Sequence, residues 1–304
     1  MRSVRLLLFL GLSGLIAAGC GDDSASPGVG SDDQLDQDAI GLLMTGASDY
    51  FDGGQALSDD RVAVENTGGK LTPQGAPIES FYFVREITSR DVHREIVIDR
   101  VEGQRPIATV SSEIELDGIF HLFYDDPESI YLPGVLDKPL AAVAHHRARF
   151  VRRIDAERHR GWRLVAVSAA EILSEPTTKD IVSLEILSNS VQRTIDDPLA
   201  LVRIADLPTF EPGEAVTLRV TTTDATDYVF LHTGTQKDEF RPLGNGVFEG
   251  TWRVGERQGR RHVGIDVLDA ETLFDDVAPY DSAMWVLHYR VAGEAAADFE
   301  DREG

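Results

Sequence analysis

The stretch PIATVSSEIELDGIFHLFY, residues 106–124, decides the fold that we predict for the first half of the chain. Most of its even positions are apolar, whereas Glu113, Glu115 and Asp117 occupy odd positions. Because successive side chains of a strand point to opposite faces, this alternation predicts one long β-strand with one buried face. Gly118 interrupts the pattern and indicates a bulge or a bend in so long a strand.

The segments around this strand predict a sheet and one helix. Apolar residues recur at helical spacing from Leu35 to Ala47, after two aspartates that can cap the helix. Residues 80–89 fit either a short aromatic helix or a strand. Further strands are expected at 93–101, 141–155 and 161–173. A helix laid across a curved antiparallel sheet is an α+β architecture, which we expect for residues 35–173.

The last two strands of this first domain resemble a known family. The segments RARFVRR (147–153) and RGWRLVAVS (160–168) look like the closing strands of the cystatin-like α+β roll of the nuclear-transport-factor-2 superfamily. The resemblance implies a conical pocket between helix and sheet. Some members of that superfamily use the pocket as isomerases or dehydratases, and many use it for binding or for pairing with themselves.

Several polar side chains could line such a pocket. The candidates expected on the apolar face are Tyr50, Tyr82, Ser112, Tyr124 and His146. An isomerase-type site also needs a carboxylate base facing a phenol or a protonated acid, and the sequence places no acid clearly inward. A buried histidine is more often a hydrogen-bonded part of the core than a base. We therefore predict no catalytic residue.

Metal binding is not expected from the histidines or from the acidic segments. His145 and His146 are adjacent on a predicted strand and point to opposite faces, so they cannot both bind one ion together with His121. The acidic stretch 266–281 lacks the closely spaced oxygens that calcium needs and is interpreted as a solvated loop. We therefore predict neither a metal nor a cofactor.

Seven arginines gather between residues 147 and 163 of an otherwise acidic chain. They could form a patch that binds an anion or a partner. They could also be the outer positions of two strands, paired with Glu113, Glu115 and Asp117 of the adjacent strand. We favour the second interpretation, because opposite charges on neighbouring strands stabilise a sheet.

The second half of the chain predicts an all-β domain. A polar linker, 174–181, is followed by seven short alternating strands within residues 182–292, joined by turns rich in Gly, Pro and Asn. Such a series is typical of an immunoglobulin-like (Ig-like) sandwich, and the entry PGEAVTLRV (212–220) resembles bacterial extracellular Ig-like domains. Trp252 and Trp285 are expected in its core, and residues 293–304 form an acidic disordered tail.

The start of the chain predicts export and lipid attachment. Residues 1–19 have the order of a secretory signal, and the apolar run from Leu6 to Ala18 is shorter than the roughly 20 residues of a membrane-spanning helix. The segment from Ala17 to Cys20 resembles the bacterial lipobox, which implies that the Cys20 thiol carries a diacylglycerol. Residues 20–34 then act as a flexible tether. In related Gram-negative lipoproteins a residue such as Gly21 favours the outer membrane or the cell surface over the inner membrane.

Charge and cysteine content exclude several classes of protein. The chain carries 29 basic and 52 acidic residues, a formal net charge of −23, which disfavours nucleic acid as a partner. The single cysteine, Cys20, excludes an internal disulfide and a Cys-rich zinc site.

Two classes of function remain. The favoured one is a lipid-anchored cell-envelope protein of non-enzymatic binding type. Its partners would be membrane lipid through Cys20 and an envelope protein, a polysaccharide or a small ligand. The alternative is an envelope enzyme of isomerase, dehydratase or hydrolase type that uses the pocket of the first domain. The sequence contains no nucleophile-elbow, zinc-protease, Walker or Rossmann motif. A deep pocket with an inward carboxylate beside Tyr or His would favour the enzyme.

Overall fold

A computed structural model describes residues 32–47, 50–51, 62–64, 77–125, 132–153, 157–233 and 236–293. The signal segment, Cys20 and the tether up to residue 31 lie outside the described residues, as does the tail from residue 294. None of the described helices is long and apolar enough to cross a membrane.

The described chain is mostly antiparallel β-structure with one long helix, α1 (Asp32–Gly46), and one short helix, α2 (Ala270–Phe274). The strands of the first half are β1 (Val62–Ala63), β2 (Ser80–Asp99), β3 (Ile107–Tyr124), β4 (Gly134–Arg152), β5 (Trp162–Val167) and β6 (Ala170–Ser174). Those of the second half are β7 (Ile181–Leu187), β8 (Gln192–Ile195), β9 (Val202–Arg203), β10 (Thr209–Phe210), β11 (Ala215–Thr222), β12 (Tyr228–His232), β13 (Lys237–Glu239), β14 (Arg241–Gly244), β15 (Val247–Arg253), β16 (Gly259–Leu268) and β17 (Ser282–Val291).

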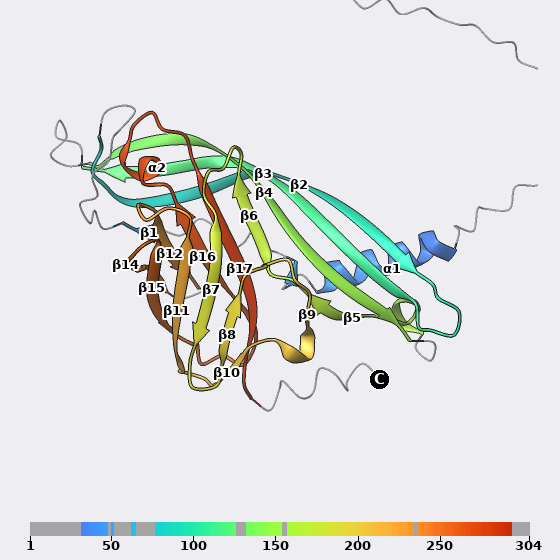
Figure 1. Ribbon diagram of the computed structural model, residues 1–304. Helices are drawn as coiled ribbons and strands as arrows, with labels where there is room; N and C mark the ends of the chain where they lie inside the picture. Colours follow the sequence, from blue (N-terminus) through green and yellow to red (C-terminus); the bar gives the residue numbers. More distant parts are fainter. Residues whose placement is uncertain are drawn as a thin grey trace, which may run out of the picture.

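One sheet runs through both halves of the chain. Its strands follow the order β1-β2-β3-β4-β6-β17-β16-β12-β13, and β1 lies against β13, so the sheet is a nearly closed barrel. The long strands β2, β3 and β4 extend beyond this barrel towards α1 (Figure 1). A second sheet, β14-β15-β11-β7-β8, packs on the outer side of β12, β16 and β17.

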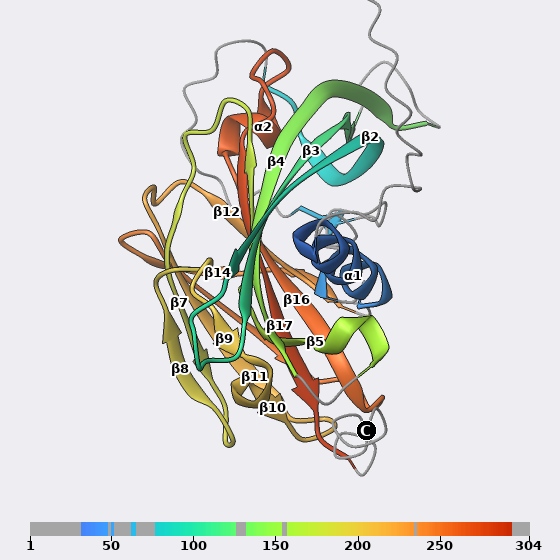
Figure 2. The same ribbon diagram turned by 90° about the vertical axis from the view of Figure 1, so that its right-hand side faces the viewer.

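The predicted fold class, an α+β domain followed by an Ig-like sandwich, is wrong. Ile172 of β6 pairs with Ala144 of β4 on one side and with Met284 of β17 on the other, so strands of the second half complete the sheet of the first. The helix α1 covers only the ends of the long strands beyond the barrel, near β5 (Figure 2). Alternation predicts which face of a strand is buried, but it does not identify the neighbouring strand.

Three clusters of buried apolar residues follow from this arrangement. The barrel core, inside the barrel, includes Phe83, Phe120, Phe230 and Met284. The sandwich core, between the two sheets, includes Val220, Ile265, Trp252 and Trp285, which confirms the prediction for both tryptophans. The helix core, under α1, includes Ile40, Met44, Val110 and Phe150.

Gly118 marks a bulge, as the sequence predicts. The pairing of β2 with β3 shifts between Ile87 and Ser89, directly opposite Gly118 and Asp117. A Cβ atom at position 118 would lie 2.1 Å from the Glu86 carbonyl oxygen, so the close approach of the two strands requires glycine.

Several predicted elements differ in detail. Residues 80–89 form a strand and merge with 93–101 into β2. The predicted strand 161–173 is divided between β5 and β6. The acidic stretch 266–281 is not a solvated loop: it contains α2, and Asp266, Asp275 and Asp281 are buried.

Candidate functional site

A row of polar residues separates the barrel core from the helix core on the inner face of the long strands. Ser112 of β3 follows Val110 of the helix core and precedes Ile114 of the barrel core. His146 of β4 lies directly opposite Ser112 in the pairing of the two strands. Ser112 and His146 are only 3% and 5% exposed. We call this row, together with Tyr50, Phe51 and His288, the junction site.

The junction site contains buried polar atoms with no hydrogen-bond partner within the described part of the chain. These atoms are Ser112 Oγ and His146 Nε2. Leaving a buried donor or acceptor unsatisfied costs about 1–3 kcal/mol. A ligand that forms hydrogen bonds with these two atoms would remove this cost from the folded protein.

Aromatic rings lie between this row and His288 of β17. The ring centroid of Phe51 lies 5.3 Å from that of His146, and the ring centroid of Tyr50 lies 5.3 Å from that of His288. The guanidinium carbon of Arg260 lies 4.6 Å from the centre of the Tyr50 ring. The segment after α1 therefore closes the junction site with two aromatic side chains.

His288 also belongs to the wall of a pocket. The pocket has a volume of about 110 Å³ and is open to solvent. Its walls include Val167 and Ser168 at the end of β5, Leu207, and Pro198 before β9. A volume of this size holds a few water molecules or one small ligand group, since a water occupies about 30 Å³ of the liquid.

The two histidines of the junction site are held in the neutral state. Burial lowers the pKa of His146 to about 4, and the charges of Arg94, Arg90 and His145 add to the effect. Burial also holds the pKa of His288 well below its usual range, together with His262 and His146. A general base works best with a pKa near the working pH, so these rings are better suited to hydrogen bonding than to proton transfer.

The structure brings together three of the five predicted pocket residues, namely Tyr50, Ser112 and His146. Tyr82 and Tyr124 lie at the far end of the long strands, about 40 Å of strand from Ser112 at roughly 3.3 Å per residue. The Tyr82 ring stacks on Phe123 at 4.2 Å. Strand periodicity places Ser112, Tyr124 and His146 on one face of a sheet, but it does not show that strands of this length pass two separate cores.

The inward carboxylate that the sequence did not reveal is Asp266, inside the barrel. Its Oδ1 accepts a hydrogen bond from Arg85 Nη2 at 3.0 Å, and its Oδ2 lies 3.0 Å from His232 Nε2. Tyr280 Oη accepts a hydrogen bond from Arg85 Nε at 3.0 Å. The Arg85 guanidinium in turn lies 5.1 Å from the centre of the Phe83 ring.

This barrel network has the acid, phenol and imidazole of an enzyme site, but its charge is already neutralised. Burial alone would raise the pKa of Asp266, whereas Arg85 and His232 outweigh this effect and hold that pKa below its usual value. An ionised carboxylate paired with a buried guanidinium is a poor proton acceptor. The available sequence signals were an aspartate within the alternating segment 261–269 and an arginine within the aromatic segment 80–89.

The prediction for the arginine-rich strands is correct in one part and wrong in another. Arg147 and Arg149 occupy exposed outer positions of β4, as predicted. They pair with Ser111 and Thr109, so the expected pairing with Glu113, Glu115 and Asp117 is wrong. Further along, Arg152 and Arg160 contact the buried carboxylate of Asp36 in α1, as does Arg100 after β2. These three arginines therefore attach the helix to the sheet.

Comparisons with known proteins leave the family open. No protein-family model matches the chain, and no curated protein matches it. One solved structure with weak similarity is a multidomain fragment of extended synaptotagmin 2. It is 11% identical over 68% of this chain and 56% of that chain, with a TM-score of 0.15, and it carries no argument about fold or function.

Proposed function

We propose that this chain is a lipid-anchored protein of the cell envelope that binds a small uncharged ligand at the junction site. The observation that carries the binding role is the pair of buried, unsatisfied atoms, Ser112 Oγ and His146 Nε2. They lie beside aromatic rings that lead to an open pocket. Ligand sites typically combine an apolar lining with a few placed polar groups.

The ligand is expected to be uncharged because of the electrostatics of the site. A cation would be repelled by Arg90 and Arg94, whose charges act on His146. An anion would need a charged donor in the buried row, whereas a neutral imidazole and a hydroxyl offer ordinary hydrogen bonds. Hydroxyl or carbonyl groups of a small neutral molecule fit these two side chains.

The proposed anchor rests on the sequence around Cys20. One acyl chain holds a protein to a membrane weakly, and two or more hold it stably, since each buried methylene contributes roughly 0.8 kcal/mol. A processed lipoprotein cysteine carries several chains. The tether that follows contains small and acidic residues, which keep a folded body away from the bilayer.

Metabolic labelling with a fatty-acid probe tests the anchor. The wild type should be labelled and retained in membranes, and Cys20→Ala should lose both properties together. Ser24→Ala, in the same tether, should keep both. A Cys20→Ala protein that is still labelled would exclude the anchor.

Native mass spectrometry of the detergent-solubilised protein from its own cells tests the ligand site. The wild type should carry a small non-covalent mass that Ser112→Val and His146→Phe have lost. His145→Phe is the matched control, because this adjacent side chain points to the opposite face of β4. If the wild type and His146→Phe have the same bound mass or none, the junction site is not the binding site.

A further inference from the structure

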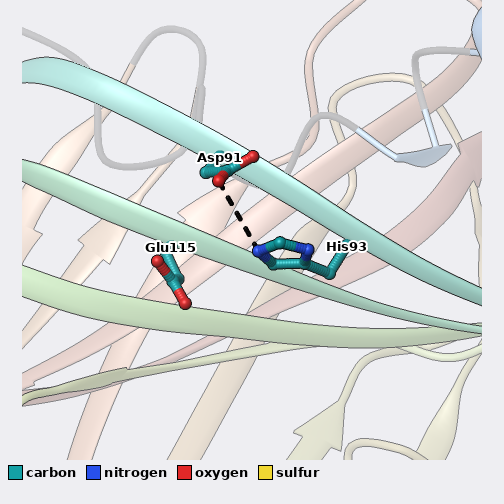
Figure 3. A group of neighbouring side chains, drawn as sticks. All are labelled: Asp91, His93 and Glu115. Carbon is teal, nitrogen blue, oxygen red and sulfur yellow. Dashed lines mark ion pairs between the residues drawn. The ribbon is translucent and has the colours of Figure 1, made fainter. Parts of the chain in front are cut away.

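We propose that Asp91 and His93 of β2 and Glu115 of β3 form a binding site for a divalent transition-metal ion such as Zn²⁺. The three side chains project from the same side of the paired strands (Figure 3). One ligand atom from each residue lies within 4.8 Å of the other two. This site is separate from the junction site, since it lies on the outer face of the sheet.

The pairing of β2 with β3 fixes this arrangement. Asp91 lies directly opposite Glu115, and His93 lies opposite Glu113, so all four side chains share one face of the ladder. The ladder continues without interruption from Ser89 to Asp99. The Cα positions of the three ligands are therefore fixed before any ion arrives, and only exposed side-chain rotamers have to adjust.

The distance between the imidazole and the first carboxylate suits a small ion with nitrogen and oxygen ligands. His93 Nε2 lies 3.5 Å from Asp91 Oδ2, and zinc bound at about 2.0–2.2 Å keeps neighbouring ligand atoms roughly 3.4 Å apart in tetrahedral geometry. The other oxygen of Asp91, Oδ1, accepts a hydrogen bond from the Val92 backbone N–H at 2.8 Å. This bond orients the carboxylate so that Oδ2 faces the imidazole.

The charge around the site favours a cation. Asp91 and Glu115 are carboxylates at directly opposed positions, which is destabilising in a sheet without a counter-charge. The next position in the pairing holds Glu113, which faces His93 on one side and His145 on the other. On this face of the ladder, arginines occur further along β4, beginning with Arg147 opposite Ser111.

The site is also accessible and incomplete. All three ligand residues are exposed, and Glu115 lines an open groove of about 410 Å³ together with Glu113 and His145. Three protein ligands leave at least one position of a tetrahedral ion for water or for an external group. One imidazole and two carboxylates suit zinc and its neighbours in the first transition row better than calcium.

Isothermal titration of the metal-stripped full-length protein with Zn²⁺ tests this proposal. We expect one saturable site per chain, and we expect His93→Gln to weaken binding at least tenfold. His121→Gln is the matched control. His121 also lies between two carboxylates, but its Nδ1 faces Asp137 at 2.7 Å and its Nε2 faces Glu86 at 3.3 Å, so those ligands do not converge.

A second measurement identifies the ligand atom directly. In ¹⁵N spectra of the histidine rings, Zn²⁺ should shift Nε2 of His93 and leave His121 unchanged. The proposal is overturned if no saturable binding occurs, or if His93→Gln and His121→Gln weaken it equally. Because His93 is exposed, His93→Gln should fold with the thermal midpoint of the wild type.

Discussion

Arg85 and Asp266 form a two-point ion pair inside the barrel, although they are far apart in the sequence. Arg85 Nη1 lies 2.8 Å from Asp266 Oδ2, and the two side chains are 2% and 0% exposed. The pair joins β2 of the first half to β16 of the second half. It therefore sits where the two halves of the chain become one barrel.

Asp266→Asn should strongly destabilise the protein. The substitution keeps the shape of the side chain but leaves the Arg85 guanidinium buried without a counter-charge, which typically costs about 3–5 kcal/mol. Equilibrium denaturation in urea measures the change. Asp206→Asn is the control, because Asp206 pairs with Arg203 at 2.5 Å on the surface, and its midpoint should be unchanged. Equal midpoints for the two variants would contradict a structural role of the buried pair.

The Arg85–Asp266 pair shows which features of the fold sequence patterns can predict and which they cannot. Alternation along residues 106–124 correctly predicts the strand and its buried face, and the helical spacing before Ala47 correctly predicts α1. Neither pattern contains information on the pairing of β6 with β17, which depends on a contact between residues more than a hundred positions apart. The strands of the predicted sandwich were recognisable from their own alternation. The barrel that some of them complete was not, because it depends on strand pairing.

The candidate sites show the same limit. Ser112 and His146 were predictable because both fall on the apolar face of neighbouring predicted strands. The separation of Tyr82 and Tyr124 from them was not predictable, because one alternating pattern continues through two different cores. The convergence of Asp91, His93 and Glu115 depends on strand register, and a shift of one residue would move each side chain to the opposite face.

Gly118→Ala should destabilise the protein because a Cβ atom at this position meets backbone. The new atom would lie 2.1 Å from the Glu86 carbonyl oxygen, so the two strands must move apart at the bulge. Such overpacking costs about 1–3 kcal/mol. Gly41→Ala is the opposite case. Gly41 lies within α1, and a Cβ atom added there would meet no heavy atom within 4 Å. This substitution should stabilise the helix by about 0.5–1 kcal/mol. Thermal unfolding should therefore move the two midpoints in opposite directions, and a common direction would be inconsistent with the described bulge.

Asp36→Asn should release α1 from the sheet. Asp36 Oδ1 accepts a hydrogen bond from Arg160 Nε at 2.6 Å, and Oδ2 accepts one from Arg100 Nη2 at 2.6 Å. Burial alone would raise the pKa of Asp36, but these hydrogen bonds outweigh it, so the pKa is lowered and the charge persists at neutral pH. Hydrogen exchange of the α1 amides should accelerate at least tenfold. Asp38→Asn, on the exposed face of the same helix, should leave exchange unchanged; matching rates in both variants would show that the arginines do not hold the helix.

His146 should make the stability of the protein depend on pH between about 7 and 4. In the unfolded chain its pKa is near 6.5, whereas in the folded protein it is lowered to about 4. In this window the unfolded chain binds a proton that the folded protein excludes, so the free energy of unfolding falls as the pH falls. The full gap between the two pKa values corresponds to ~3 kcal/mol.

Urea denaturation of His146→Gln at a series of pH values measures this contribution. Glutamine keeps a hydrogen-bonding group at the junction site and removes the titration, so the variant should lose less stability than the wild type between pH 7 and pH 4.5. His145→Gln, on the outer face of β4, should retain the slope of the wild type. Arg90 and Arg94, whose charges act on His146, are present in both glutamine variants, so the difference between these variants isolates one imidazole. Parallel slopes for wild type and His146→Gln would mean that this ring is protonated as easily in the folded protein as in the unfolded chain.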